Sequence, residues 1–254
     1  MTDSTRRSIL KALAGAGGLL TLTGCDSLSR TTWFRDILSS GETLSDVAQH
    51  AITPRKGMAR EFAREDISPQ FRQNGSTNPQ TSEYLELAAN NFRDYVLKVG
   101  GRVKNPMNLD MAAIRALPSR TQITRHDCVE GWSAIGEWTG ARLNALLKQV
   151  QPLPGARYLV FHCADGYGSS QSRYYESIDM EDAEHPQTLL AYELNGEALP
   201  IGNGAPLRLR VERQLGYKMA KYIMSIEVVD SFDDIGGGNG GFWEDRGYAW
   251  YAGI

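Results

Sequence analysis

The sequence predicts an α+β fold that contains more strand than helix. Between Tyr95 and Asp230, several segments alternate apolar and polar residues with a period of two, which is typical of strands. Only short stretches carry apolar residues at helical spacing. The chain has 254 residues, of which 41% are hydrophobic and 22% are charged, and this composition fits one large globular domain or two small ones.

The expected strands define the core of the predicted fold. Alternation predicts strands over Tyr95–Gly101, Leu207–Glu212 and Tyr222–Asp230. Strands are also expected at Thr121–Cys128 and Ala156–Asp165. Because the dense pattern starts only after residue 80, we expect the folded domain to occupy residues 81–254.

Three helices are expected between these strands. Leu109–Pro118 has helical spacing and is stopped by its proline. Thr139–Val150 begins with a Thr cap and carries apolar residues on one face. Asp179–Gly196 predicts a short helix followed by a strand that ends at a turn. Two more short helices are expected upstream, around Asp36–Ala48 and Met58–Ala63.

Residues 1–25 have the order of an export signal. Arg6 and Arg7 precede an apolar, small-residue run from Ala12 to Gly24, which is shorter than the roughly 20 residues that a membrane span needs. The adjacent arginines resemble a twin-arginine signal, which exports folded proteins. "LTGC" resembles a lipobox, in which Cys25 would carry a lipid. We therefore expect a periplasmic protein with a lipid anchor at Cys25, and an ordinary signal peptide is the alternative.

Residues 26–80 are rich in polar residues and contain three prolines, so we expect a tether or an irregular arm. Export of a folded protein is commonly required when a cofactor has to be inserted in the cytoplasm. The signal is therefore a first indication that the chain carries a cofactor.

Charge and motifs exclude several classes of protein. The net charge of −3 argues against a nucleic-acid partner, and three cysteines are too few for a disulfide scaffold. Zinc-finger, nucleophile-elbow and phosphate-loop motifs do not occur. The haem motif C-x-x-C-H is also missing, so the electrons of a redox reaction would have to be exchanged with a separate protein.

Cys128 lies in "RHDCVEGW", directly after Arg125, His126 and Asp127. A thiolate is a soft metal ligand, and cationic neighbours lower the pKa of a thiol. From these residues alone, Cys128 is a packing residue, half of a disulfide with Cys163, a nucleophile or a metal ligand.

A basic stretch follows the turn in "NGAPLRLRVERQLGYKMAKYI". Arg208 comes directly after the Gly-Ala-Pro turn, and Lys218 and Lys221 come about ten residues later. Such cations can hold a phosphate, together with backbone N–H groups in a turn. Taken alone, however, the stretch is better interpreted as a basic, solvated strand edge.

Three segments together carry a family resemblance: "RHDCVEGWSAIGEWTGARLNALL", "HPQTLLAYELNGEALPIGNGAPLRLRV" and "LGYKMAKYIMSIEVV". They resemble the sulfite oxidase superfamily of molybdopterin enzymes, and within it the exported catalytic subunit of bacterial methionine-sulfoxide reductase systems. The resemblance extends over Asn90–Asp230. It implies a sulfite-oxidase-type molybdopterin-binding fold of mixed sheets with short helices. It also implies one Mo-molybdopterin, with one molybdenum, per chain.

The resemblance assigns roles to individual residues. The family's one protein ligand to molybdenum falls on Cys128, which would be the catalytic residue. The implied cofactor contacts are Asn90, Arg93, Asp94, Cys163, Asn203, Arg208, Met219, Ala220 and Lys221. This chain departs from the sulfoxide reductases at two places. It has Cys163 where they usually have a Thr, and it has "ERQLGYK" where they have an aromatic-rich segment.

The implied reaction is oxygen-atom transfer with two electrons. Reduction of a sulfoxide or a related S- or N-oxide, small or protein-bound, is expected first. Sulfite oxidation is the alternative within the enzyme class, and a non-catalytic exported binding lipoprotein is the alternative outside it. The family also implies a separate electron-transfer partner, such as a membrane cytochrome b.

Overall fold

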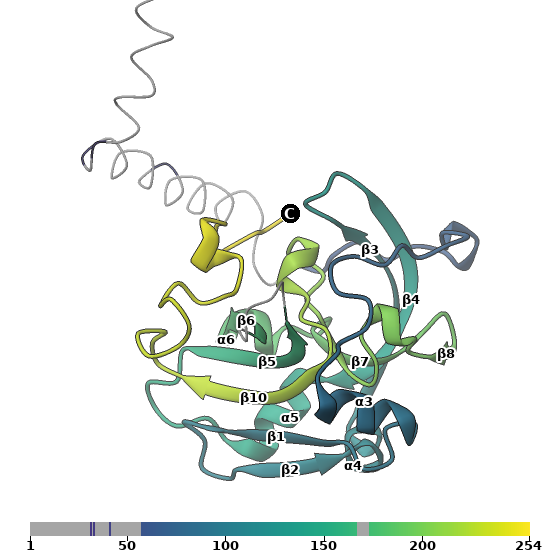
Figure 1. Cartoon of the computed structure of the whole chain (residues 1–254). Helices are drawn as coiled ribbons and strands as arrows, with labels where there is room; N and C mark the ends of the chain where they lie inside the picture. The colour runs from purple at the N-terminus through teal and green to yellow at the C-terminus, as the bar shows by residue number, and fades with distance from the viewer. Residues whose placement is uncertain (1–30, 32, 34–40, 42–56, 167–172) are drawn as a thin grey trace, which may run out of the picture. The chain divides into compact units, whose positions relative to one another are not determined.

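The computed structural model describes residues 31, 33, 41, 57–166 and 173–254 (Figure 1). The chain divides into two compact units, Met1–Thr53 and Pro54–Ile254. Among the described residues, every strand belongs to Pro54–Ile254, and the helices that accompany the sheets are short. The expected α+β class with mixed sheets is confirmed.

The first sheet has five strands, and its order mixes segments from both ends of the domain. Strands β1 and β10 pair in parallel, whereas the other neighbours are antiparallel. Across the sheet the strands are β2 (Met107–Asp110), β1 (Val96–Gly101), β10 (Ile223–Val229), β5 (Tyr158–Gly166) and β6 (Arg173–Asp179).

The second sheet is built on a long hairpin, seen at the right of Figure 1. All of its pairs are antiparallel. Its order is β3 (Ser119–Asp127), β4 (Ser133–Arg142), β7 (Leu189–Leu194) and β8 (Glu197–Ala198), and β9 (Arg208–Arg210) also pairs with β7. The strand β9 therefore brings the basic stretch into the second sheet.

Short helices join the strands. They are α3 (Ser82–Ala89), α4 (Met111–Ala116), α5 (Leu143–Val150) and α6 (Met180–Glu184), with 3-10 turns η1 (Arg64–Asp66), η2 (Ile201–Asn203), η3 (Gly216–Lys218) and η4 (Glu244–Arg246). Aspartates cap α4 and α6, because the Asp110 carboxylate accepts from Ala113 N at 2.7 Å and the Asp179 carboxylate from Asp182 N at 2.9 Å.

The hydrophobic core joins both sheets. Helix α5 buries Leu143, Leu146, Leu147 and Val150, and these residues belong to one large cluster with side chains of β1, β5, β7, β9 and β10. A smaller cluster forms around Trp138 of β4, whose ring meets that of Phe71 at 5.0 Å in a T-shaped arrangement.

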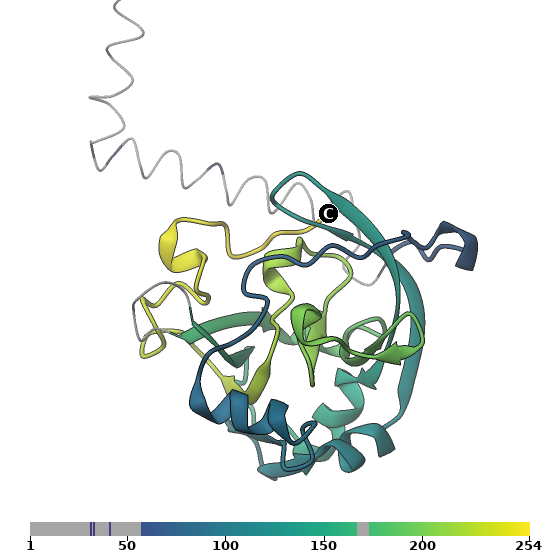
Figure 2. The same cartoon turned by 45° about the vertical axis from the view of Figure 1, so that its right-hand side comes forward.

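Residues 57–80 run along the second sheet (Figure 2). Phe62 N donates to Ile123 O at 2.9 Å, and Ser68 N donates to Ile135 O at 3.0 Å. The helix expected at Met58–Ala63 is wrong, because Glu61 of this segment forms a β-bridge with Thr124. The helix expected at Asp36–Ala48 lies outside the described residues, apart from Gly41.

Two other expected helices begin later than predicted. The helix predicted to start at Thr139 starts at Leu143, because Thr139 belongs to β4 and its hydroxyl meets that of Thr121 across the hairpin at 2.8 Å. The helix predicted from Leu109 starts at Met111, because β2 takes the preceding residues. Strands β2, β4, β6 and β8 and helix α3 were not predicted.

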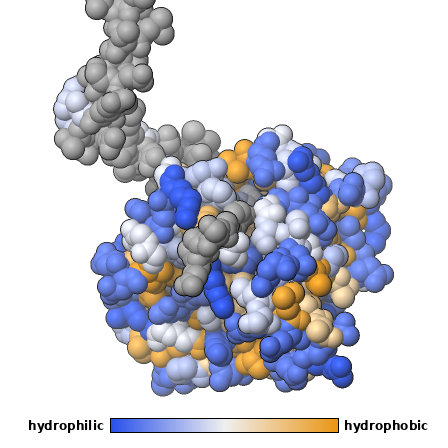
Figure 3. All heavy atoms as spheres, in the orientation of Figure 1, coloured by the Kyte–Doolittle hydropathy of each residue, from blue (hydrophilic) through white to orange (hydrophobic). Residues whose placement is uncertain are grey.

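The molecular face in Figure 3 is mainly hydrophilic, and its hydrophobic residues lie in small groups between polar ones. Within the described part of the chain, no helix is both long enough and apolar enough to cross a membrane.

Candidate functional site

Cys128 lies at the tip of the β3–β4 hairpin. Asp127 pairs with Ser133, so a loop of five residues, 128–132, joins the two strands. Cys128 N donates to Trp132 O and Gly131 N donates to Cys128 O, both at 2.9 Å. Gly131 has φ +84, a left-handed conformation that a glycine adopts without strain. The loop therefore holds the thiol at a fixed position, where it is 8% exposed.

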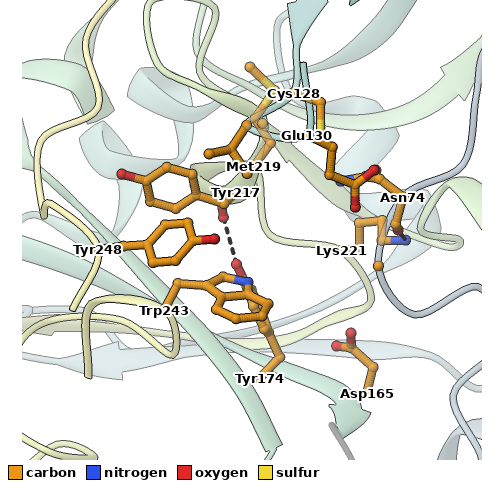
Figure 4. Close-up of a pocket in the computed structure, with 13 residues that line it drawn as sticks. Asn74, Cys128, Glu130, Asp165, Tyr174, Tyr217, Met219, Lys221, Trp243 and Tyr248 are labelled. Atoms are coloured by element: carbon orange, nitrogen blue, oxygen red, sulfur yellow. Dashed lines mark hydrogen bonds between the residues drawn. The ribbon is translucent and has the colours of Figure 1, made fainter. Parts of the chain in front are cut away.

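A cleft with a volume of about 140 Å³ opens beside this thiol. It is lined by Asn74, Gly75, Cys128, Val129, Glu130, Asp165, Tyr174, Gly216, Tyr217, Met219, Lys221, Trp243 and Tyr248. Figure 4 shows Cys128 and Met219 at one end, four aromatic rings along one side, and Lys221 with Asn74 and Glu130 on the other. Segments far apart in the sequence thus meet around one cleft.

Arg208 of β9 is a buried cation without a carboxylate partner among the described residues. Its Nη1 donates to Asn203 O at 2.9 Å, but Nε and Nη2 have no hydrogen-bond partner. The guanidinium lies over the Trp138 ring at 4.9 Å. Burial, and then the charge of Arg210, lower the pKa of Arg208 to about 9.

Arg210 differs from Arg208 in having a full set of partners. Both side chains are at most 1% exposed and both lie over Trp138. The Arg210 guanidinium donates twice to the carboxylate of Glu212, at 2.9 and 2.5 Å. The period of two along "RLRVE" puts these three side chains on the same face of the chain. Because Glu212 neutralises Arg210 alone, the charge of Arg208 stays uncompensated.

His126 of β3 is fully buried beside this pair. Arg210 Nη1 lies 3.0 Å from Nδ1 of the ring, and Nε2 has no hydrogen-bond partner within the described part of the chain. Since Arg210 can only donate, Nδ1 accepts and the ring proton is on Nε2. Burial, followed by the charges of Arg210, Arg208 and Lys221, lowers the pKa of His126 well below its usual value. The imidazole is therefore neutral at pH 7.

Lys221 completes the basic cluster at the cleft. Its ammonium donates to Asn74 O at 2.6 Å, to Gly202 O at 3.3 Å and to Ser76 O. Burial, and then the charge of Arg208, lower its pKa to about 7. Gly204 separates the two cations: it has φ +115, and an added Cβ would lie 3.0 Å from the Lys221 side chain and 3.2 Å from Arg208.

Carboxylates also face the cleft. Burial raises the pKa of Asp165 to about 6, although Lys221 acts in the opposite direction. Asp165 Oδ1 is buried and has no hydrogen-bond partner among the described residues. Burial likewise raises the pKa of the Cys128 thiol, so the protein alone does not favour its thiolate form.

Comparison with known proteins identifies the family. The sequence profile described as "Oxidoreductase molybdopterin binding domain" matches residues 84–234, which is more than half of the chain. The chain belongs to this family. It is a molybdopterin-binding oxidoreductase and therefore an enzyme.

Two relatives of this molybdopterin-binding oxidoreductase have names that refer to one activity. A candidate protein-methionine-sulfoxide reductase subunit, YedZ1, of Azospira oryzae is 36% identical over 98% of this chain and 87% of its own length. The protein-methionine-sulfoxide reductase catalytic subunit MsrP of Xanthomonas axonopodis pv. citri is 38% identical over 55% of this chain and 46% of its own length. A solved structure, the sulfane dehydrogenase SoxCD from Paracoccus pantotrophus, matches with a TM-score of 0.49 and 24% identity, over 54% of this chain and 39% of that one.

The orphan polar atoms of the site fit the cofactor of a molybdopterin-binding oxidoreductase. Molybdopterin carries a phosphate, and the two partnerless N–H groups of Arg208 are donors for such an anion. Buried polar groups normally have partners, so the donors of Arg208 and His126 that lack one among the described residues fit a bound group at this site. Within the described residues, no three His, Cys, Asp or Glu side chains come together as a metal site of their own.

The expected site residues fall into three places. Cys128, Met219 and Lys221 line the cleft together. Arg208 and Asn203 lie behind it, buried and bonded to each other. Asn90, Arg93 and Asp94 form an exposed local turn after α3, in which Asn90 Nδ2 donates to Asp94 at 2.6 Å and Arg93 N donates to Asn90 Oδ1 at 3.1 Å.

Cys163 and Ala220 are buried in the large core cluster. The thiol of Cys163 lies 3.8 Å from Phe161 O, and burial raises its pKa well above the usual value. Both Cys128 and Cys163 are free cysteines, so the disulfide between them is excluded.

Several site residues were not predicted. Arg210 was missed, although the alternation in "LRLRVE" could have paired it with Arg208. Asp165, Trp243 and Tyr248 carry no sequence signal, because only the tertiary fold brings them to the cleft. Arg125, in contrast, is exposed and donates to the neighbouring Asp127 at 2.9 Å, so it does not reach the cleft.

Proposed function

We propose that this chain is an exported molybdenum enzyme that reduces a sulfoxide or a related oxide, with Cys128 as the protein ligand to the metal. The observation that carries the proposal is that Cys128 shares one cleft with Met219 and Lys221, which lie some 90 residues further along the chain. Three residue positions assigned to the cofactor by family resemblance thereby face the same space. The names of the two relatives support the sulfoxide as substrate.

The basic cluster would hold the cofactor's phosphate. Arg208 would donate through Nε and Nη2, and Lys221 would be charged again once an anion lies beside it, because an opposite charge raises the pKa of an amine. Asn203 fixes the Arg208 side chain through its carbonyl. When bound, the molybdenum cofactor supplies the two-electron, oxygen-accepting chemistry. The chain supplies one thiolate, the charges that neutralise the phosphate and a shaped cleft.

The reaction would consume a sulfoxide, two electrons and two protons, and would yield a sulfide and one water. The S–O bond breaks, and sulfur is reduced by two electrons. Lys221 and Asp165, which have pKa values of about 7 and about 6, are cleft residues able to exchange protons near neutral pH. The electrons would come from a separate electron-transfer protein, for which a membrane cytochrome b is our candidate.

Two cleft carboxylates favour a neutral oxide over sulfite. Glu130 and Asp165 both line the cleft, and a carboxylate repels a sulfite anion but not a neutral oxide. Sulfite oxidation is therefore the second candidate, and both substrates belong in one assay.

Export is part of the same proposal. Residues 1–25, with the arginine pair and Cys25, lie outside the described residues. A twin-arginine signal would deliver the folded, loaded enzyme to the periplasm, and a lipid on Cys25 would hold it at the membrane. Replacement of both arginines with lysine should retain the enzyme in the cytoplasm, which fractionation of the cells would measure.

The experiment that tests the proposal is metal analysis combined with a dye-linked assay. Protein from a cofactor-competent host should contain about one molybdenum per chain and should oxidise a reduced dye with methionine sulfoxide. Cys128→Ser should retain pterin but lose turnover, whereas Lys148→Met, an exposed change on α5, should leave turnover unchanged. A preparation without molybdenum, or full activity of Cys128→Ser, would contradict the proposal.

A further inference from the structure

Four aromatic side chains form one side of the cleft, which we name the aromatic wall: Tyr174, Tyr217, Trp243 and Tyr248. Figure 4 shows their rings gathered opposite Lys221, Asn74 and Glu130. The ring of Tyr248 lies 5.2 Å from that of Tyr217 and 5.2 Å from that of Trp243. Tyr217 is 8% exposed and Tyr248 is 37% exposed, so the wall extends from the buried end of the cleft to its open edge.

Half of this wall comes from outside the region that defines the family. The profile match ends at residue 234, whereas Trp243 and Tyr248 belong to the C-terminal segment, residues 236–254. The family's fold therefore does not by itself dictate these two rings. They can therefore adapt a common cofactor site to a particular substrate.

A buried charge cluster anchors the C-terminal segment. Lys218 Nζ donates to Glu176 at 2.5 Å and to Glu244 at 2.6 Å, and all three side chains are at most 1% exposed. Glu244 starts the turn η4, which lies between Trp243 and Tyr248. Through Glu244, these charge-assisted hydrogen bonds tie the turn between the two rings to Lys218 and Glu176.

Hydrogen bonds along the segment fix it at further points. Phe242 N donates to Tyr175 O at 2.9 Å, and the Tyr217 hydroxyl donates to Ala249 O at 2.7 Å. Asp245 accepts from the Tyr175 hydroxyl and from Gly237 N, the latter at 2.8 Å. The aromatic wall is therefore a built surface, ordered before any ligand arrives.

The two sides of the cleft suit two different parts of a ligand. The side with Lys221 and Glu130 is polar, whereas the aromatic wall offers ring faces and edges. Ring faces carry partial negative charge, which favours apolar groups and polarizable sulfur over anions. A substrate with an organic group on sulfur can use this wall, and an inorganic oxyanion cannot.

We propose that the aromatic wall binds the organic group of the substrate, so that the enzyme selects neutral sulfoxides that bear an aryl or an extended alkyl group. This inference rests on the proposed function and deepens it, because it names the substrate class and the residues that select it. Trp243 and Tyr248 are the specificity residues. They contact the substrate's organic group and take no part in oxygen transfer.

Steady-state kinetics of the loaded enzyme test the inference with methyl p-tolyl sulfoxide and dimethyl sulfoxide. Loss of a contact with one small apolar group costs about 10-fold or more in specificity. Trp243→Leu and Tyr248→Ala should therefore each raise the KM for the aryl sulfoxide about 10-fold, with kcat within about threefold. The KM for dimethyl sulfoxide should change less than about threefold, because its methyl groups are too small to cover the wall.

Tyr251→Ala is the matched control, because Tyr251 belongs to the same segment but does not line the cleft. It should leave both KM values unchanged. A second readout needs no turnover: the product methyl p-tolyl sulfide should quench tryptophan fluorescence of the intact enzyme, and Trp243→Leu should abolish the quenching.

Each outcome separates the inference from the proposed function. Equal KM changes for both substrates, or none in either variant, would overturn the aromatic wall as the specificity surface while sulfoxide reduction stands. If the wild-type enzyme reduces no sulfoxide, the proposed function fails, and sulfide quenching still reports whether the wall binds organosulfur groups. Sulfide binding that Trp243→Leu leaves intact would overturn the wall in either case.

Discussion

Replacement of Arg208 with methionine should stabilise the cofactor-free chain and weaken cofactor binding. Burial and Arg210 lower the pKa of Arg208 from its usual value to about 9, which corresponds to a cost of about 5 kcal/mol for keeping the charge in the folded state. The cost diminishes only where the folded chain binds fewer protons than the unfolded chain, which is between these two pKa values. Because pH 7 lies below both values, the whole cost is present there. Methionine loses the bond to Asn203 O and the contact with Trp138, together about 2–3 kcal/mol.

The expected net gain is therefore about 2 kcal/mol in the free energy of unfolding, measured by urea titration of cofactor-free protein at pH 7. In the loaded enzyme, the loss of two charged donors to phosphate should weaken cofactor retention by about 100-fold. Arg210→Met is the matched control, and it should lower the free energy of unfolding where Arg208→Met raises it. It leaves Glu212 buried without its cation, which should cost about 3–5 kcal/mol. The reasoning is refuted if Arg208→Met destabilises the cofactor-free chain as Arg210→Met does.

Three further predictions concern the surroundings of the site. The pKa of Lys221 is lowered from 10.5 to about 7, so the folded chain binds fewer protons than the unfolded chain between these values. Lys221 should therefore contribute a rise in the stability of the cofactor-free protein between about pH 7 and 10.5, measured as the pH dependence of the difference in the free energy of unfolding between the wild type and Lys221→Met. Gly216→Ala should cost about 1–3 kcal/mol in thermal or urea unfolding, because its Cβ would lie 2.4 Å from His126 Nε2; an unchanged midpoint would contradict the packing described. Lys218→Met should cost about 3–5 kcal/mol, because two buried carboxylates lose their cation, whereas the exposed Lys148→Met should cost under 0.5 kcal/mol.

The sequence predicted those parts of the fold whose pattern is local. Strands β1 and β3 follow their period of two closely, since one side of each faces the core. Strands β5 and β10 were also predicted, although their burial does not keep this alternation. Strand β4 was missed because both of its faces are largely buried, so "SAIGEWTGAR" shows no alternation. The short helix predicted at Met58–Ala63 failed because Glu61 pairs with Thr124, more than 60 residues away, and this pairing decides the local conformation.

The site was predictable only where residues of one kind stand close together in the sequence. Cys128 ends a strand, and Arg208 and Lys221 stand in one basic stretch, so these positions could be proposed. The polar inner face of β3, where Gln122, Thr124 and His126 are all buried, was interpreted as an ordinary strand because its partners Arg210 and Glu212 lie some 90 residues further along the chain. The sequence does not show that Arg208 is buried or that it lacks a carboxylate partner, because both properties depend on the tertiary fold.

For the N-terminal family motif, which begins at Asn90, the expectation from the sequence differs from the structure. The resemblance assigns Asn90, Arg93 and Asp94 to the cofactor. In the structure, Asn90 Nδ2 donates to the Asp94 carboxylate and Arg93 Nε donates to the backbone oxygen of Asn90, in a turn after α3. Asn91 and Phe92 have φ values of 56 and 58 within this turn, a left-handed conformation uncommon for such residues. Their role stays a prediction, which Asn90→Ala and cofactor retention would test.

The central claim is that the Cys128 thiolate binds the molybdenum of a molybdopterin cofactor. X-ray absorption at the molybdenum edge counts the sulfur neighbours of the metal and therefore tests this claim directly. The account predicts three sulfur neighbours in the wild-type enzyme, two from the dithiolene of the cofactor and one from Cys128, and two in Cys128→Ser. Three sulfur neighbours in the Cys128→Ser protein would contradict it.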